Sequence, residues 1–183
     1  SFHSNSSSSH TSSSGTGSFS AQSSPFSAIT YIDIPANISS VSVYYMDSTV
    51  GNPTMTFSDS TPANGATGLI DATQLISVTA STIYTFSYSA IATQVAGTPF
   101  SVTITAKDVY GNVVAGFSGS TSLSSTLETP TPSSAVFASG SWTGNITLTK
   151  AGNISITTTY GGSSGTSAFF AVQPAAIDHV TVT

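Results

Sequence analysis

Hydrophobic and polar residues alternate through much of this chain, which is the period of a β-strand with one buried face. The same alternation recurs at residues 142–148 and 154–160, and no segment of useful length repeats with the period of a helix. The pattern therefore predicts an all-β fold. Its clearest case places Phe100, Val102, Ile104 and Ala106 on one face and Ser101, Thr103 and Thr105 on the other.

Turn-forming residues separate these runs, at residues 50–53, 64–65, 110–112, 151–153 and 161–162. Short strands divided by such turns are typical of antiparallel β-sandwiches of the immunoglobulin-like (Ig-like) type. A change of pattern near residues 93–97 divides the body into an N-terminal β-domain, 28–93, and an Ig-like β-sandwich, 94–176. The first is short for a full set of strands, so we expect one of the two to need completion. Residues 177–183 are predicted to be a further strand.

Residues 1–27 have a different composition, because serine fills positions 6–9 and 12–14 with only scattered aromatic residues between them. Such a segment cannot bury enough apolar surface to become ordered by itself. We therefore expect an extended Ser-rich N-terminal tail, held either by the body of the same molecule or by a neighbouring subunit.

Two segments resemble the Ig-like repeats of bacterial and archaeal surface proteins. Residues 96–114 (AGTPFSVTITAKDVYGNVV) resemble the second strand and the turn after it, and residues 147–156 (TLTKAGNISI) resemble the closing hairpin. Residues 176–183 look like the opening strand of a further repeat. The resemblance implies an Ig-like sandwich and an extracellular or cell-surface location, and it says less about function than about fold.

The chain as a whole resembles the subunits of archaeal thread-like filaments, with two β-domains, a Ser-rich tail and an unpaired C-terminal strand. This resemblance implies head-to-tail polymerisation by donor-strand complementation, in which an extended segment of one subunit supplies a missing strand to the next. The partners would then be identical subunits. Either residues 1–27 or residues 177–183 can be the donor, and we favour the tail.

Charge is scarce in this sequence. The 183 residues include 2 Lys or Arg and 7 Asp or Glu, against 38 serines and 29 threonines. Because about a quarter of the residues in an ordinary soluble domain are charged, hydroxyls, amides and attached sugar must hydrate this surface. A net charge of −5 with two basic residues excludes nucleic acid and anionic lipid as partners. No apolar stretch is long enough to span a membrane, and without cysteine there is no disulfide.

Four asparagines begin an Asn-x-Ser/Thr triplet, which is the acceptor for N-linked glycosylation: Asn5, Asn37, Asn145 and Asn153. Such triplets arise often by chance in a chain rich in Ser and Thr, so strand phase is needed to judge them. Asn145 alternates with Ile146, and Asn153 with Ile154, so both side chains are predicted to face solvent. We expect covalent glycans at several of these four sites and no other cofactor; the alternative is that they are unmodified turn residues.

Metal binding is weakly supported. Asp47, Asp59 and Asp71 recur every 12 residues, each followed two positions later by Thr, which is compatible with a calcium loop. The sequence has no dense cluster of acidic residues to supply the six or more oxygens that Ca²⁺ takes, so turn-capping carboxylates are the favoured interpretation. We predict no metal site.

Enzymatic activity is not expected either. His3 and His10 lie in the Ser-rich segment, and Asp178 and His179 are adjacent on a predicted strand, where neighbouring side chains point to opposite faces. The chain also lacks the Gly-x-Ser-x-Gly turn that presents a nucleophilic serine in hydrolases. We therefore predict no catalytic and no cofactor-binding residues.

Two further possibilities concern crosslinks and sugar binding. Lys107 or Lys150, with Glu128 as an acid, has the chemistry of an intramolecular isopeptide bond, but one lysine faces outward by phase and the other lies in a turn. Exposed aromatic rings can stack on sugars. Phase places Trp142 inward, so Tyr44 is the favoured exposed ring.

These observations favour a non-enzymatic structural subunit of an extracellular filament. The alternative is a repeat fragment of a larger surface adhesin or S-layer protein, with a stalk or glycan-binding role. A third, weaker hypothesis is an accessory domain of a secreted glycoside-active enzyme. A gene that continues into more repeats favours the adhesin, and a short gene favours the filament.

Overall fold

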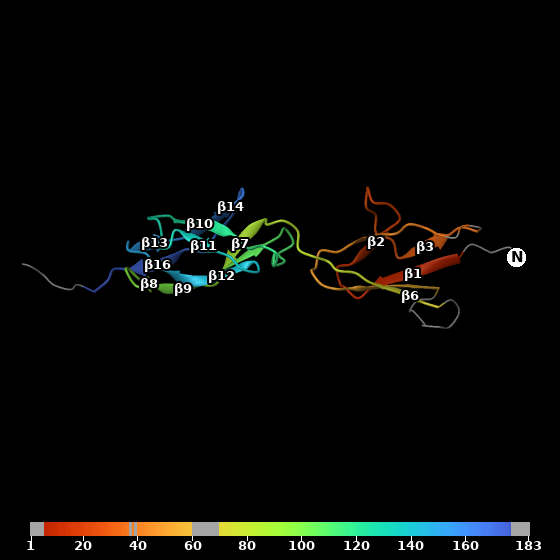
Figure 1. The fold of residues 1–183 in the computed structure, drawn as a ribbon, viewed down its shortest axis with the longest axis horizontal. Coiled ribbons are helices and arrows are strands. Elements are labelled where there is room, and N and C mark those ends of the chain that lie inside the picture. Colours follow the sequence, from red (N-terminus) through yellow and green to blue (C-terminus); the bar gives the residue numbers. More distant parts are fainter. Residues whose placement is uncertain (1–5, 37, 39, 60–69, 177–183) are drawn as a thin grey trace, which may run out of the picture. The chain divides into compact units, whose positions relative to one another are not determined.

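The structure is a computed structural model that describes residues 6–36, 38, 40–59 and 70–176. The chain divides into two compact units, Ser1–Thr79 (unit 1) and Ala80–Thr183 (unit 2) (Figure 1). All regular secondary structure within the described residues is β-strand, and nearly all strand pairings are antiparallel. The predicted all-β fold is confirmed. No helix in this part of the chain is long and apolar enough to cross a membrane.

Unit 1 contains one four-stranded antiparallel sheet and one two-stranded sheet. The larger sheet has the order β3-β1-β5-β6, and the smaller one pairs β2 with β4. The strands are β1 (Ser6–Ser12), β2 (Ser18–Ser20), β3 (Tyr31–Ile34), β4 (Tyr44–Met46), β5 (Thr54–Ser58) and β6 (Ala72–Leu75).

The Ser-rich segment differs from the extended tail that its composition predicts. Its described part contributes β1 and β2 to unit 1, and β1 lies in the interior of the larger sheet. Ser8 pairs with Ile32 of β3, and Thr11 pairs with Thr56 of β5. Residues 6–9 of β1 pair with β3 and residues 9–12 pair with β5, so backbone pairing runs along the whole strand although its side chains supply little apolar surface.

A small aromatic group forms the centre of unit 1. The ring of Phe19, which is 4 % exposed, lies 4.4 Å from that of His10, 5.0 Å from that of Tyr45 and 5.7 Å from that of Phe57, measured between centroids. Phe19 and His10 both come from the Ser-rich segment. This segment is therefore part of the interior of unit 1.

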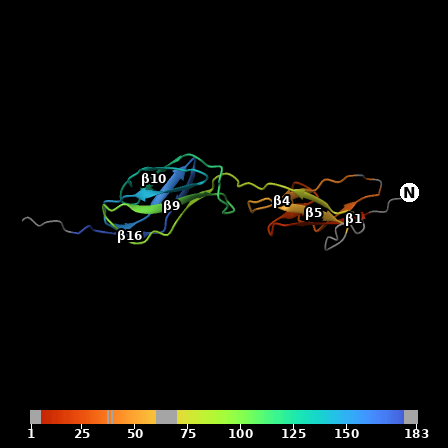
Figure 2. The same ribbon diagram turned by 60° about the horizontal axis from the view of Figure 1, so that its bottom comes forward.

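Unit 2 is a β-sandwich. Figure 2 shows β9 and β10, which belong to its two main layers, whose orders are β12-β9-β7 and β11-β10-β14-β15. A third sheet, β13-β16-β8, includes the parallel pairing of β16 with β8. The first layer comprises β7 (Thr85–Tyr88), β9 (Phe100–Lys107) and β12 (Ser141–Ile146). The second comprises β10 (Ser120–Ser125), β11 (Ser134–Val136), β14 (Ile156–Tyr160) and β15 (Ser163–Thr166). The third comprises β8 (Gln94–Val95), β13 (Gly152–Ile154) and β16 (Phe170–Gln173).

The two units divide between Thr79 and Ala80, earlier than the boundary that the sequence suggested near residues 93–97. The reason is β7, which pairs with β9 and places Phe86 in the core of unit 2. A strand upstream of the apparent boundary thus belongs to the downstream sandwich.

The core of unit 2 follows the predicted alternation. Trp142 is partly buried and packs against this core, as its phase predicted. The buried hydrophobic residues are Phe86, Phe100, Val102, Ile104, Ala106, Phe117, Leu123, Ala135, Phe137, Ile146, Leu148, Ile154, Ile156, Phe170 and Val172.

The edge strands of the two main layers meet at one side of unit 2. Thr85 Oγ1 donates a hydrogen bond of 2.9 Å to the Ser164 carbonyl, and Ser163 Oγ donates one of 2.8 Å to the Ile83 carbonyl. Gly165 is required here, because a Cβ at this position would lie 2.0 Å from the carbonyl oxygen of Phe86. The absence of a side chain lets β15 approach the backbone of β7.

Candidate functional surface

The structure describes two of the four predicted glycosylation sites. Asn145 lies on β12 beside the buried Ile146, and Asn153 lies on β13 beside the buried Ile154. Both asparagine side chains are exposed, as the strand phase predicted. Asn5 and Asn37 lie outside the described residues. Whether any of the four carries a glycan stays a prediction.

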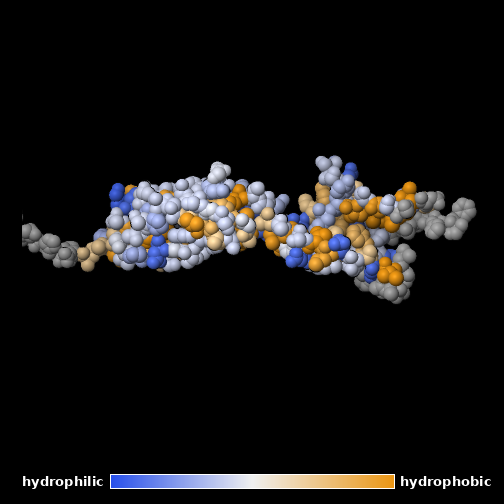
Figure 3. Space-filling model, in the orientation of Figure 1, coloured by the Kyte–Doolittle hydropathy of each residue, from blue (hydrophilic) through white to orange (hydrophobic). Residues whose placement is uncertain are grey.

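Hydroxyl groups cover the outward faces of the sandwich in unit 2, and most of the unit 2 surface seen in Figure 3 has pale, near-neutral colours. In one layer Thr103 Oγ1 lies 2.9 Å from Thr143 Oγ1, across β9 and β12. In the other, Thr157 Oγ1 lies 2.9 Å from Thr166 Oγ1, across β14 and β15. Cross-strand pairs of this kind hydrate and align the strands without charge.

Asp108 is a structural carboxylate. It is 2 % exposed, and it accepts hydrogen bonds from the backbone amides of Ser81, Tyr110 and Asn112 at 3.1, 2.9 and 2.9 Å. Burial alone would raise its pKa, but the hydrogen bonds from the Asn112 side chain and from these amides hold the pKa of Asp108 below its ordinary value. The ionised carboxylate therefore joins the start of unit 2 to the turn after β9.

Asp47 has a similar role in unit 1. Burial acts to raise its pKa, yet hydrogen bonds donated by the Thr16 hydroxyl, the Tyr45 hydroxyl and the Thr49 amide hold the pKa of Asp47 well below its usual range. The Thr49 amide closes an Asx-type turn, which is the favoured interpretation of this aspartate from the sequence. In the part of the chain that the structure describes, no three His, Cys, Asp or Glu side chains gather as metal ligands would.

The two lysines bind backbone carbonyls. Lys107 Nζ donates to the Gly111 carbonyl at 3.3 Å, and Lys150 Nζ donates to the Leu127 carbonyl at 3.2 Å. Glu128 accepts hydrogen bonds from the backbone amides of Thr149 and Lys150 at 2.6 and 2.8 Å. These contacts fasten a turn, and they do not bring either amine to the carboxamide that an isopeptide bond needs.

His10 is the one candidate catalytic residue of the Ser-rich segment that lies among the described residues. It is 7 % exposed, its Nε2 is 2.8 Å from the Ile29 carbonyl, and its buried Nδ1 has no hydrogen-bond partner. The His10 ring packs against Phe19 and Phe57, and within the described residues no carboxylate is bonded to it. The sequence pattern did not predict the strand that carries His10, because serines lie on both sides of it.

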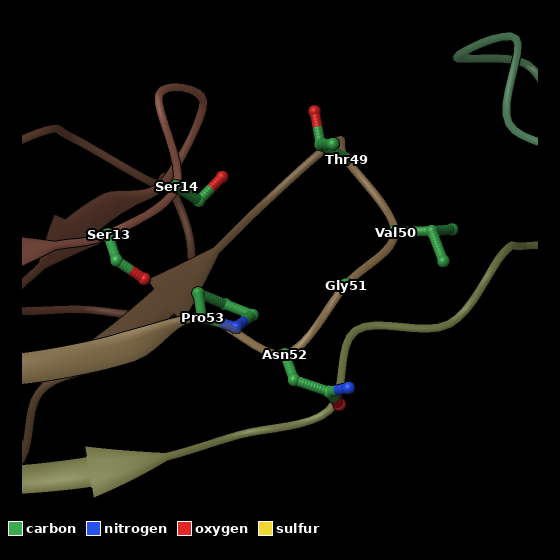
Figure 4. A pocket seen from close by; sticks show the side chains of 7 residues that line it. All are labelled: Ser13, Ser14, Thr49, Val50, Gly51, Asn52 and Pro53. Carbon is green, nitrogen blue, oxygen red and sulfur yellow. The ribbon is translucent and has the colours of Figure 1, made fainter.

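Small hollows occur in both units. The one drawn in Figure 4 has a volume of about 230 Å³ and lies in unit 1 between Ser13, Ser14 and residues 49–53. Its stick view shows the serine and threonine hydroxyls and no titratable side chain. A larger hollow of about 580 Å³ lies beside the β14–β15 hairpin of unit 2. Neither contains the nucleophile and base that a hydrolase site requires.

Comparison with known proteins leaves the family open. No protein-family model matches the chain, and no curated protein does. The D00-D0 domain of Intimin is similar in structure, with a TM-score of 0.47 and 17% identity over 93% of this chain and 85% of that chain.

Domains of the surface-layer protein SbsC are also similar in structure. Domains 1 to 6 give a TM-score of 0.40 and 17% identity over 88% of this chain, which spans only 20% of that SbsC chain. Domains 4 and 5 give the same score and identity over 68% of this chain and 66% of theirs. Because these scores and identities are low, the likenesses carry no argument about function.

Proposed function

We propose that this chain is a non-enzymatic structural module of a cell-surface protein. One observation carries the proposal: unit 2 faces solvent with rows of serine and threonine, and the described carboxylates that accept several hydrogen bonds all fasten turns. Such a surface is suited to a mechanical role outside the cell, with N-linked glycans at Asn145 and Asn153. Labelling intact cells with an antibody against unit 2 tests the location. Signal confined to lysed cells would contradict it.

The module has two candidate settings, a repeat in a larger surface protein and a subunit of a filament. The two settings differ in what the purified chain does, since a repeat stays monomeric and a filament subunit polymerises.

The position of β1 is the observation that keeps the filament as a second candidate. This strand lies between β3 and β5, and its principal buried side chain is His10. The same strand from a second copy would make the same backbone hydrogen bonds, which is the condition for strand exchange and head-to-tail growth. Residues 177–183, the other candidate donor, lie outside the described residues.

A pair of cysteines distinguishes these settings, because the chain has no cysteine of its own. Thr11 and Thr56 are register partners on β1 and β5, close enough for a disulfide after Thr11→Cys and Thr56→Cys. If β1 completes its own unit, oxidation gives a monomer on a non-reducing gel. If β1 is exchanged, oxidation gives a ladder of covalent multimers.

The matched control is Thr157→Cys with Thr166→Cys, a pair inside unit 2 that is expected to give an intrachain bridge in both cases. A monomer band from native filaments would overturn donation by β1. A chain that remains monomeric at every concentration would favour the repeat.

A further inference from the structure

We propose that the β14–β15 hairpin of unit 2 carries a binding site for a neutral carbohydrate. The site goes beyond the structural role above and does not depend on whether the module is a repeat or a filament subunit. It comprises a hydroxyl row on the outer face of one layer and, on the opposite face of the same hairpin, an aromatic platform formed by Tyr160, which packs against Phe117.

The hollow at the hydroxyl row is an open, shallow surface with a volume of about 580 Å³. It is lined by Ser120 and Ser122 of β10 and by residues 159–164 of the hairpin. An adjoining hollow of about 360 Å³ shares Tyr160, Gly161 and Ser163 and is lined by Ile83, Val114 and Phe117 on its apolar side. The polar hollow and the apolar hollow therefore adjoin at the tip of the hairpin but lie on opposite faces of β14, so a ligand that uses both must pass over Gly161 and Gly162.

The hydroxyl row has unused hydrogen-bonding capacity. Ser122 is the register partner of Thr159, and Thr159 is the register partner of Ser164, so three exposed hydroxyls cross three neighbouring strands. Within the described residues these three hydroxyls make no hydrogen bond, whereas on the next row Thr157 and Thr166 bond each other. Each free hydroxyl can donate one hydrogen bond and accept others, which matches the hydroxyls of a sugar.

The aromatic platform is fixed in orientation. Tyr160 is 44 % exposed, and its ring centroid lies 4.8 Å from that of Phe117, with the planes tilted by 59°. A second ring, Tyr84, is 64 % exposed and lines a further hollow of about 380 Å³ with Ser163 and Ser164. A pre-oriented ring can receive the C–H face of a sugar at little entropic cost.

Charge and backbone shape narrow the ligand class. None of the residues lining the three hollows is charged, so nothing there would pair with a carboxylate, sulfate or phosphate group. Gly161 and Gly162 adopt positive φ values of 55° and 90°, which keep side chains off the tip of the hairpin. The geometry thus favours neutral hexoses and N-acetylhexosamines over anionic polysaccharides.

The test is an NMR titration of the full chain, made without glycans, with mannotriose, cellotriose and chitotriose as probes. We expect at least one probe to cause saturable chemical-shift changes at residues 159–164 at millimolar concentration. Tyr160→Ala should weaken that binding at least about tenfold, and Ser122→Ala about two- to tenfold, the value of one hydrogen bond. Tyr110→Ala removes a ring that is more exposed than Tyr160 and lies outside the three hollows, and it should leave affinity unchanged.

The proposal is overturned if neither the probes nor the glycosylated chain shifts the hairpin, or if Tyr160→Ala and Tyr110→Ala have equal effects. If Tyr160→Ala unfolds unit 2, Ser122→Ala still tests the site. Ser122 is exposed, and this substitution removes only a hydroxyl group. A further titration uses the glycosylated chain itself as the ligand. It distinguishes a free oligosaccharide from a glycan attached to another copy of this chain. Shifts that appear with this ligand alone assign the site to a glycan on another copy.

Discussion

Unit 1 and unit 2 are both built from β-strands, yet they are held together differently. Among the described residues, unit 1 buries two hydrophobic side chains, Phe19 and Ile32, whereas fifteen form the core of unit 2. Unit 1 therefore depends on backbone pairing, on one aromatic group and on hydroxyl contacts around Asp47. We therefore expect unit 2 to fold without unit 1, and unit 1 to be the less stable of the two, so that strand exchange would cost least there.

The largest expected effect comes from removing the central ring of unit 1. Phe19→Ala should lower the free energy of unfolding of unit 1 by about 3–5 kcal/mol, because a buried phenylalanine is replaced by a cavity beside His10 and Phe57. Amide hydrogen exchange should show loss of protection in β1, β2 and β4, with unit 2 unaffected. Loss of protection in unit 2 as well would show that the two units unfold together, and would contradict the view that they are stabilised independently.

A matched change in unit 2 should be tolerated. Ile104→Ala removes a fully buried side chain and should cost about 2–5 kcal/mol, seen as a lower urea midpoint for unit 2. The other core residues still exclude water, so unit 2 should remain folded at 25 °C. A collapse of unit 2 would contradict the view that it is the self-sufficient unit.

Acid should weaken unit 2 through Asp108. The pKa of this carboxyl is lower in the folded chain than its ordinary value, so its contribution is complete above about pH 4 and is lost as pH falls through the folded pKa. The melting temperature of unit 2 should therefore decrease when the pH is lowered below about 4. Asp108→Asn should lower it at pH 7 and make its pH dependence shallower. An unchanged pH profile in the variant would remove Asp108 from this role.

The smallest expected effect concerns the hydroxyl pairs on the outer faces. Thr103→Val breaks the contact with Thr143 but keeps the shape of the side chain, and should change stability by about 0.2–1 kcal/mol. Chemical denaturation with Thr143→Val and the double variant measures the coupling between the two hydroxyls. A coupling well above this range would mean that unit 2, like unit 1, relies on hydroxyl contacts.

Alternation in the sequence was enough to find β9, β12 and β14 of unit 2. Phe100, Ile104 and Ile146 are buried as predicted, and Asn145 is exposed as predicted, because apolar and polar residues differ strongly at neighbouring positions. In β1 that contrast is missing. Serine fills both faces, and the strand is specified by distant partners in β3 and β5, which no local pattern reveals.

The candidate carbohydrate site was outside the reach of the sequence for a related reason. Tyr44, the ring favoured from strand phase, is indeed exposed, but the proposed platform is Tyr160. The hydroxyl row consists of Ser122, Thr159 and Ser164. The two serines look like many others in the sequence, and only the strand register aligns them with Thr159. Residue type and spacing carry no signal for such a row.

Gly165 has a consequence for how copies of this protein coexist at high concentration. Proteins with few charges have little mutual repulsion to keep them apart, and open sheet edges invite further strands to add. By letting β15 come against β7, the missing side chain closes two of those edges in unit 2. A larger residue there would be expected to leave these two edges open and so to promote aggregation.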